Sequence, residues 1–321
     1  MREIKTIIIS RTDSIGDVVL TLPMAQLLKQ KFPDCKIIFL GKTYTKPVLE
    51  CCVNIDRIIC WDEIEKDSPA GQLEFFRSLN ADCIVHVFPN KKVASLAKMA
   101  GIPVRIGTSH RLFHWFACNK LPNFTRKNSH LHEAQLNFKL LAPLGIASES
   151  SLKEMQDLFA FRNIKPLGGE LSNMLDKSRY NLILHPKSRG SAQEWGIGNF
   201  SKLIKLLPEN KFKIFITGTA QEGKLMKSIF SENPSVVDLT GKLSLSELIS
   251  FINNCDGLVA ASTGPLHLAA VLGKNAIGIY PSKRPINPGR WAPIGKNVSI
   301  VQAENVSEIK AVEVARILEV R

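Results

Sequence analysis

The chain contains 321 residues, of which 45% are hydrophobic and 22% are charged, and its formal net charge is +13. This composition excludes a disordered tail, and no run approaches the ~18 apolar residues that a membrane-spanning helix needs. We therefore expect a soluble globular protein that stays in the cytoplasm and is long enough for two hydrophobic cores.

Seven cysteines are present, an odd number, and none forms a CxxC pair. Their spacing does not match a zinc site, and several lie in apolar segments that are typical of strands. We expect buried free thiols, because free cysteine is among the most often buried residue types.

Short β-branched segments alternate with longer amphipathic segments in the first half of the chain. The first pattern favours strands and the second favours helices. The expected strands are residues 6–10, 36–40, 57–61, 81–88 and 104–107. The expected helices are residues 15–32, 44–52, 72–79, 91–100 and 132–141.

The second half repeats this alternation. The expected strands are residues 181–186, 213–218, 235–239, 257–261, 276–280 and 298–301. The expected helices are residues 198–206, 220–230, 245–253, 265–272 and 306–320. Strands that alternate with helices predict parallel sheets covered on both faces, so the fold class is doubly wound α/β.

Residues 147–179 show no clear period and contain prolines and glycines. We place a domain boundary near residue 170, which divides the chain into domains 1–170 and 171–321. Ligands of doubly wound domains bind at the carboxyl ends of the strands, so we expect the site in a cleft between two facing domains.

Two segments, residues 101–132 and 257–303, each contain five Lys or Arg residues and no acidic residue. Such segments attract anionic partners: a nucleotide, a phosphorylated glycan, a lipid headgroup or a nucleic acid. An ordinary solvated basic surface is the alternative for each of them.

The stretch 10-SRTDSIGDVVLTLP-23 leads from the first strand into a helix. It lacks the G-x-G-x-x-G fingerprint of dinucleotide sites and the GK[ST] of a P-loop. Asp17 follows Gly16, where another molecule can approach the backbone, and its carboxylate could accept a proton from a hydroxyl nucleophile. The alternative is that Asp13 is an N-cap and Asp17 a first-turn charge favoured by the helix dipole.

The stretch 185-HPKSRGSAQEWGIGNF-200 follows the first strand of the second domain. Its basic and hydroxyl side chains and its glycine suit a phosphate group, although basic Gly/Ser loops are also common on surfaces. We expect Trp195 to pack on the domain and anchor this loop.

The stretch 260-AASTGPLHLAAVLGKNAIGIYPSK-283 combines a buried strand, a hydroxyl turn and an apolar helix. Pro265 suits the first helical position, and the backbone N–H groups of the turn with the Thr263 hydroxyl make an anion site. His267 falls in the first turn, where it either contacts a ligand or is a satisfied core residue. The basic loop 282–293 could close over the same site.

These three stretches, in this order and spacing, resemble glycosyltransferase family 9, the lipopolysaccharide heptosyltransferase family. The resemblance runs nearly the full length of the chain. It implies a GT-B architecture of two Rossmann-like domains facing across a cleft. It also implies a metal-independent, inverting transfer from a nucleotide sugar, usually ADP-heptose, to a lipopolysaccharide core acceptor.

The resemblance implies a role for individual residues. Asp17 matches the general base, and Glu222 matches the acidic residue that holds the donor ribose. The donor-binding set in the second, nucleotide-sugar-binding domain is Lys187, Ser188, Arg189, Ser191, Glu222, Ser262, Thr263, Gly264 and His267. Apart from the motif match, we expect Asp13, Arg111 and Lys120 of the first domain to bind the acceptor.

Two positions depart from the family pattern. Gln193 stands where members often carry a lysine that neutralises the leaving group, which leaves Lys187 or Arg189 for that task. Ser262 stands where some members carry an aspartate that contacts the donor sugar. The family pattern as a whole leads us to expect heptose as the transferred sugar. The alternative is that the enzyme uses another nucleotide sugar to build a different cell-envelope glycan.

In 110-HRLFHWFACNKLPNF-124, bases alternate with aromatic residues. This segment predicts either a contact with a phosphorylated, membrane-embedded acceptor at the cytoplasmic face of the inner membrane or a partly buried helix with a basic rim. The charge also leaves open a non-catalytic protein that binds anions or nucleic acid. No nucleic-acid motif is present, so a nucleic-acid partner is not expected.

Overall fold

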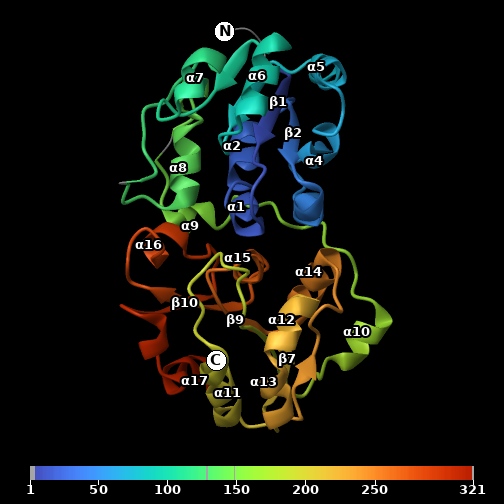
Figure 1. Ribbon diagram of the computed structural model, residues 1–321, viewed down its shortest axis with the longest axis vertical. Coiled ribbons are helices and arrows are strands. Elements are labelled where there is room, and N and C mark those ends of the chain that lie inside the picture. The colour runs from blue at the N-terminus through green and yellow to red at the C-terminus, as the bar shows by residue number, and fades with distance from the viewer. Residues whose placement is uncertain (1–3, 128, 148, 320–321) are drawn as a thin grey trace. The chain divides into compact units, whose positions relative to one another are not determined.

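The computed structural model describes residues 4–127, 129–147 and 149–319, and the chain divides into two compact units, Met1–Asn163 and Ile164–Arg321 (Figure 1). We call them unit 1 and unit 2. The Asn163 side chain donates to the Glu50 carbonyl in unit 1 at 3.0 Å, and the Ser250 hydroxyl donates to the Lys165 carbonyl in unit 2 at 2.8 Å. These bonds place the boundary a few residues before the expected residue 170.

Unit 1 contains a five-stranded parallel sheet in the order β3-β2-β1-β4-β5. Its strands are β1 (Thr6–Ser10), β2 (Lys36–Gly41), β3 (Arg57–Cys60), β4 (Cys83–His86) and β5 (Val104–Ile106). Ile8 packs in a cluster with side chains of the helices on one face, and its neighbours Ile7 and Ile9 are buried on the other face. Both faces of β1 are therefore covered, as parallel sheets require.

The five expected helices of unit 1 are present, one of them divided, and a short helix that the sequence did not predict begins at Trp61, where the end of a strand was expected. Residues 15–32 form two helices, because Pro23 begins the second one and cannot continue the first. The helices are α1 (Ile15–Val19), α2 (Pro23–Lys31), α3 (Lys46–Glu50), α4 (Trp61–Ile64), α5 (Pro69–Ser78), α6 (Lys91–Met99), α7 (Leu112–Ala117), α8 (Glu133–Lys139) and α9 (Leu152–Met155). Thr43–Thr45 and Ala142–Leu144 form short 3-10 turns, η1 and η2.

Unit 2 contains a six-stranded parallel sheet in the order β11-β10-β9-β6-β7-β8. Its strands are β6 (Tyr180–His185), β7 (Phe212–Ile216), β8 (Val237–Asp238), β9 (Gly257–Ala261), β10 (Asn275–Pro281) and β11 (Val298–Ala303). Each coincides with an expected strand to within two residues, because the buried strands of a parallel sheet are nearly continuous apolar runs.

The helices of unit 2 differ from expectation at several places, and one is that the expected helix 306–320 begins only at Ala311, after a 3-10 turn at Val306–Glu308. The expected helix 220–230 is divided at Met226, and a short helix lies inside the basic loop 282–293. The helices are α10 (Gly169–Met174), α11 (Ile197–Leu206), α12 (Ala220–Leu225), α13 (Lys227–Glu232), α14 (Leu245–Asn254), α15 (Gly264–Val271), α16 (Pro288–Trp291) and α17 (Ala311–Glu319), with the 3-10 turn η3 (Val306–Glu308). Val320, the last residue of the expected helix 306–320, lies outside the described residues.

The segment without a clear period, residues 147–179, contains the short helices α9 and α10. A Ser151–Glu154 capping box begins α9, which is a signal that hydrophobic periodicity does not register. No residue of α10 is buried, so no apolar face exists for a periodicity to reveal.

Each unit has its own hydrophobic core, and all seven cysteines are buried and free, as predicted. Within the described residues, no helix has the length and apolar character that crossing a bilayer requires.

Candidate active site

The strand order of unit 2 reverses at the pair β6 and β9. The chain passes from β6 to β7 and β8 on one side, then crosses to β9, β10 and β11 on the other. Ligands of such sheets bind at the carboxyl ends of the strands beside this switch point. The loops after β7, β6 and β9 leave that edge from adjacent strands, so the structure brings the segments of Glu222, Ser188 and Thr263 to one edge.

The turn after β9 forms the N-terminus of α15. Thr263 is the N-cap residue, and its buried hydroxyl oxygen has no hydrogen-bond partner in the part of the chain that the structure describes. The N-terminus of a helix carries partial positive charge. In α15 the N–H groups of Leu266 and His267 donate to the Thr263 carbonyl, so the N–H of Gly264 is the donor left for a ligand. Gly264 and Pro265 occupy the first helical positions, and His267 is buried in the first turn. This turn has the properties of an anion site.

Ser262, just before this turn, lies beside the hydroxyl group of Tyr280. Burial raises the pKa of Tyr280 above its ordinary value. The Tyr280 hydroxyl donates to the Trp291 carbonyl at 2.8 Å, and the Trp291 ring nitrogen donates to the Pro285 carbonyl at 3.1 Å. The basic loop 282–293 is thus tied to β10, and its predicted closure over a ligand stays a prediction.

The loop after β6 is organised by Glu194, a residue that the sequence did not single out. The backbone N–H of Ser188 donates to its carboxylate at 2.9 Å, and Lys187 forms an ion pair with the same group. Burial opposes ionisation, but the bonds from Lys187 and Ser188 hold the pKa of Glu194 below its ordinary value. Arg189 and Gly190 have positive φ values of 51° and 78°, and both residues are exposed.

Two predicted cations in this loop differ in their environment. Lys187 is paired with Glu194, whereas Arg189 is exposed and makes no hydrogen bond or ion pair within the described chain. The hydroxyl of Ser191 donates to the Ser188 carbonyl at 2.7 Å. Gln193, at the position of the family lysine, donates to Asn305 at 2.9 Å.

Trp195 anchors the loop, as predicted. The side chain is 1% exposed, its ring nitrogen donates to the Ile309 carbonyl at 2.9 Å, and it packs edge-on against Phe200 at 5.0 Å between ring centroids. The ring nitrogen of Trp195 therefore has a hydrogen-bond partner inside unit 2, and its apolar ring is packed there.

Glu222 forms a capping box at the start of α12. One carboxylate oxygen accepts from the Thr219 N–H at 2.7 Å, and the other oxygen is buried and has no partner among the described residues. Nearby, His185 bonds to the Thr217 hydroxyl at 2.9 Å, and burial lowers the pKa of His185 to about 4. The imidazole is therefore neutral at neutral pH.

In unit 1, the loop after β1 places Arg11 at the centre of three carboxylates. Its guanidinium donates to Asp13 at 2.7 Å, to Glu133 at 3.1 Å and to Asp17. Burial lowers the pKa of Arg11, but the carboxylates of Asp17, Asp13 and Glu133 more than offset this, so the net shift is upward. Ser14 donates to the second oxygen of Asp17, so two bonds orient this carboxylate.

A second layer of this cluster comes from α8 and from Arg126, which precedes this helix. Arg126 donates to Glu133 and to the Asn137 oxygen, both at 3.0 Å, and Asn137 donates to the Leu20 carbonyl at 3.2 Å. The sequence motifs did not indicate Arg11 or this layer. The signal was present: Glu133 and Asn137 are four residues apart, on the buried face of a helix where apolar residues are the norm.

Asp13 is not the N-cap that the alternative interpretation assumed. Ser14 occupies that position, and Asp13 instead pairs with Arg11. Burial, with help from the charges of Asp17 and Glu133 and against that of Arg11, raises the pKa of Asp13 to about 6.

Arg111 and Lys120 lie elsewhere in unit 1. Both are exposed, one just before α7 and the other just after it, and no hydrogen bond or ion pair links either side chain to Asp13 or Asp17 in the described structure. The acceptor-binding set is thus brought together only in part.

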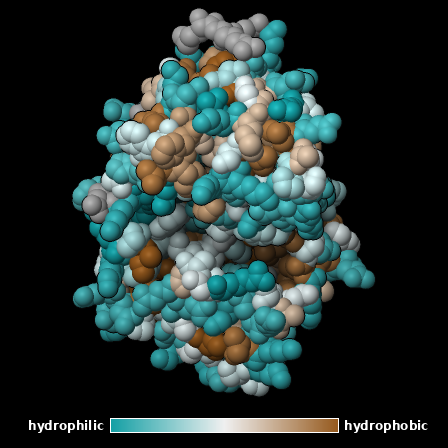
Figure 2. All heavy atoms as spheres, turned by 45° about the horizontal axis from the view of Figure 1, so that its top comes forward, coloured by the Kyte–Doolittle hydropathy of each residue, from teal (hydrophilic) through white to brown (hydrophobic). Residues whose placement is uncertain are grey.

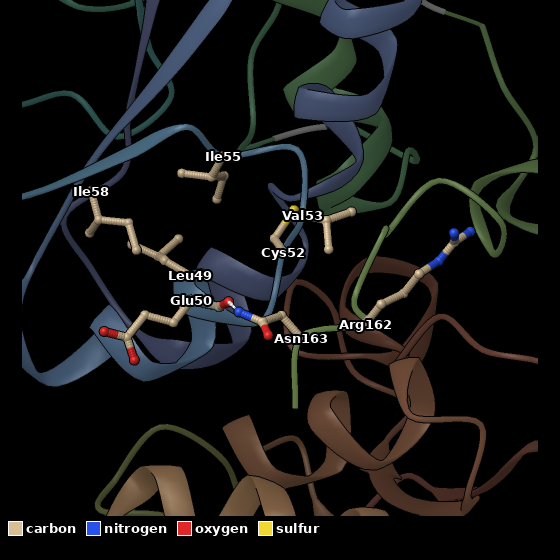
Figure 3. A pocket seen from close by; sticks show the side chains of 8 residues that line it. All are labelled: Leu49, Glu50, Cys52, Val53, Ile55, Ile58, Arg162 and Asn163. Carbon is tan, nitrogen blue, oxygen red and sulfur yellow. Dashed lines mark hydrogen bonds between the residues drawn. The ribbon is translucent and has the colours of Figure 1, made fainter. Parts of the chain in front are cut away.

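A pocket of about 470 Å³ opens elsewhere in unit 1 (Figure 3). Its lining is Leu49, Glu50, Cys52, Val53, Ile55, Ile58, Arg162 and Asn163. None of the predicted site residues lines it, and Figure 3 shows the Arg162 guanidinium extending away from the apolar side chains. The pocket therefore adds nothing to the site.

Comparison with known proteins identifies relatives. A family model described as glycosyltransferase family 9 (heptosyltransferase) matches residues 74–319. Lipopolysaccharide heptosyltransferase 3 of Escherichia coli K12 is 23% identical over 315 residues, which cover 92% of this chain and 87% of that protein. The crystal structure of a family 9 glycosyltransferase from Veillonella parvula has a TM-score of 0.81 at 20% identity, covering 100% of this chain and 98% of that one.

The structure of the ADP-heptose lipopolysaccharide heptosyltransferase II of Escherichia coli has a TM-score of 0.76 at 17% identity, covering 98% of both chains. At this identity the likeness shows the fold, which is the predicted GT-B fold of two Rossmann-like domains. The family model extends over most of the chain and includes the motifs of unit 2. The chain therefore belongs to glycosyltransferase family 9, the heptosyltransferase family, and is a glycosyltransferase.

Proposed function

We propose that the protein transfers heptose from ADP-heptose to a lipopolysaccharide core acceptor, with inversion at the anomeric carbon and without a metal ion. The observation that supports this most is the convergence of the three donor-motif loops at the switch point of unit 2. The names of the relatives from Escherichia coli support the choice of heptose and ADP.

In the proposed reaction, Asp17 is the general base. It takes the proton from the acceptor hydroxyl as that oxygen forms a bond to the anomeric carbon of the donor. The bond from this carbon to the diphosphate breaks, and its electron pair leaves on the phosphate oxygen. Attack opposite the leaving group inverts the configuration. The bonds from Arg11 and Ser14 orient the carboxylate for this step.

The donor diphosphate is proposed to bind at the N-terminus of α15. The unpartnered hydroxyl of Thr263 and the backbone N–H of Gly264 are fixed donors for the negative charge that develops as the diphosphate leaves. His267, Ser188 and Ser191 complete this part of the site, and the Glu222 oxygen without a partner accepts from the donor ribose.

Gln193 stands where family members often carry a lysine that neutralises the leaving group, and Arg189 is the better candidate for that task. It is exposed and unpaired in the described structure, whereas Lys187 would have to leave Glu194 before it could reach a phosphate. We propose that Arg189 neutralises the charge of the leaving group and that Lys187 stabilises the loop through its ion pair with Glu194. Asp13, Arg111 and Lys120 are proposed to bind the phosphorylated acceptor, the last two through their positive charges.

A second candidate donor follows from Ser262, which stands where some relatives carry a sugar-contacting aspartate. A hydroxyl can donate one hydrogen bond, which a carboxylate cannot, and it has no charge, so a different sugar could occupy this subsite.

The decisive experiment is a transfer assay on purified protein with ADP-heptose, ADP-glucose, UDP-glucose and GDP-mannose, in parallel with thermal-shift measurements. We expect stabilisation by, and turnover of, ADP-heptose, with activity unchanged in EDTA. Stabilisation by a UDP- or GDP-sugar alone would transfer the assignment to another donor, and loss of turnover in EDTA that magnesium restores would contradict transfer without a metal.

A further inference from the structure

Helix α7 exposes an unusual set of apolar side chains. Leu112 is 78% exposed, Phe116 is 71% exposed and Trp115 is 62% exposed, and all three belong to this one short helix. Met99, at the end of the neighbouring α6, is 54% exposed. Single exposed apolar residues are normal, but a contiguous group marks an interaction surface.

Helix α7 exposes its apolar face, whereas helices usually bury that face against their own domain. Residues 112, 115 and 116 share one face, since positions three and four apart are neighbours on a helix. That face points outward, whereas His114 and Ala117 on the opposite face are buried. A helix that packs only to stabilise its own domain would bury the leucine and the aromatic residues instead.

Polar bonds hold α7 in this orientation. The His114 ring bonds to the Thr108 carbonyl at 3.0 Å, and the Trp115 ring nitrogen donates to the Ser109 carbonyl at 2.7 Å. Lys98 of α6 donates to the Phe116 carbonyl at 2.8 Å. The apolar face is therefore presented by a fixed helix, not by a loose segment.

The surrounding chain is strongly basic. Between Asp82 and Glu133 there is no acidic residue, and the eight Lys or Arg residues are Lys91, Lys92, Lys98, Arg105, Arg111, Lys120, Arg126 and Lys127. Lys98, Arg111 and Lys120 are exposed and lie on the segments that carry or contact α7. Figure 2 shows apolar side chains at the surface among many hydrophilic ones.

We propose that α7 is the docking surface of this protein for an anionic lipid bilayer. Trp, Phe and Leu enter the boundary between headgroups and acyl chains, and the surrounding bases attract anionic headgroups.

A second copy of the chain would bring two acid-free basic segments together, which like-charge repulsion opposes. A nucleic acid would use the bases but would gain nothing from Leu112 or Met99. The inference does not rest on the proposed donor or acceptor.

Flotation with extruded vesicles tests the proposal, with phosphatidylcholine alone compared with phosphatidylcholine containing phosphatidylglycerol. We expect binding to the anionic vesicles only. The triple change Leu112→Ser, Trp115→Ser, Phe116→Ser should weaken the partition coefficient about tenfold or more. Raising the salt from about 0.1 M to about 1 M, which shortens the Debye length from about 10 Å to about 3 Å, should also weaken it.

Leu225→Ser is the matched control, because Leu225 is as exposed as Trp115 but lies on α12 of unit 2. This variant should bind vesicles like the unchanged protein. Circular dichroism and melting of all variants verify that they fold. Because the assay measures binding and not transfer, its failure would leave the proposed function untouched.

Trp115 also reports insertion directly. The emission of the unchanged protein should shift to the blue on adding anionic vesicles, and Trp115→Phe should abolish the shift while keeping most of the binding. Equal binding to neutral vesicles, or binding that survives the triple change, would overturn the proposal. So would a change in oligomeric state, measured by sedimentation velocity, as the only effect of the triple change.

Discussion

At the scale of single residues, the two aspartates after β1 have separate environments. Asp17 is held by Arg11 and Ser14, whereas Asp13 pairs with Arg11 and has a raised pKa of about 6. Two carboxylates that share one guanidinium repel each other, and the one held by the extra hydroxyl bond is better oriented. This geometry distinguishes the proposed base from the proposed acceptor contact.

We predict that Asp17→Asn folds normally, binds ADP like the unchanged protein and loses turnover by about 10²–10⁴-fold, because an amide cannot accept the proton. Asp13→Asn is the matched control, and it should raise the KM for the acceptor more than it lowers kcat. Steady-state kinetics and calorimetric titration with ADP separate the two effects. Near-normal turnover of Asp17→Asn would remove this residue from the mechanism.

His86 is buried in β4 and lies 5.7 Å from His114 between ring centroids. Neither ring nitrogen of His86 has a partner in the described part of the chain. Burial, together with His114 and Arg105, lowers the pKa of His86 to about 3. The His86 imidazole therefore takes up a proton less readily in the native state than in the unfolded state, where its pKa is about 6.5.

We predict that the free energy of unfolding decreases as the pH falls from about 6.5 towards 3, by about 1 kcal/mol per pH unit from His86 alone. Its stabilising contribution is complete above pH 6.5, because both states are then unprotonated. In His86→Leu the dependence between pH 6.5 and 4 should be shallower, although His185 and His114 maintain part of it. Urea unfolding at several pH values measures this, with the exposed His110→Gln as control; identical slopes for all three proteins would refute the assignment.

At the scale of elements, α15 is the helix that most directly connects fold and chemistry. It is buried nearly all round, so its N-terminus cannot move away from the switch point without disturbing the core. Its N-cap residue, Thr263, leaves a buried hydroxyl oxygen without a partner in the described structure. Natural N-caps usually bond a backbone N–H of their own helix, so this hydroxyl is free for a ligand.

We predict that Thr263→Val leaves the melting temperature unchanged or raises it, since an unpartnered buried hydroxyl costs stability. The same variant should bind ADP roughly 10–100-fold more weakly, the effect of losing a hydrogen bond of about 1.5–3 kcal/mol to a charged group. The control is Ser201→Ala, which removes a buried hydroxyl bonded to Glu232 elsewhere in unit 2. That control should lose stability and keep its affinity for ADP; unchanged affinity of Thr263→Val would refute the diphosphate site.

At the scale of the whole molecule, the chain consists of two units with separate sheets and separate cores. Membership of the family removes the non-catalytic alternative that the charge alone had left open. The division of labour, with the acceptor in unit 1 and the nucleotide sugar in unit 2, stays a proposal.

We predict that residues 164–321 fold as an isolated fragment and bind ADP, and that residues 1–163 fold but do not bind it, because each fragment keeps a whole sheet and core. Neither fragment should transfer heptose alone, since the proposed base and the donor site lie on different fragments. Calorimetric titration of each with ADP measures this. A folded fragment 164–321 without affinity for ADP, or ADP binding by fragment 1–163, would contradict the division.

The sequence by itself determined the α/β class, most strands and the family, because buried parallel strands are continuous apolar runs and the three motifs are local. It also determined that the cysteines are buried and that Trp195 is an anchor. Local patterns cannot register which distant side chains meet, so only the tertiary structure decided the Arg11 cluster, the control of Lys187 by Glu194 and the outward face of α7. Each of these depends on which face of an element the rest of its unit covers, and that is settled by packing between segments far apart in the chain.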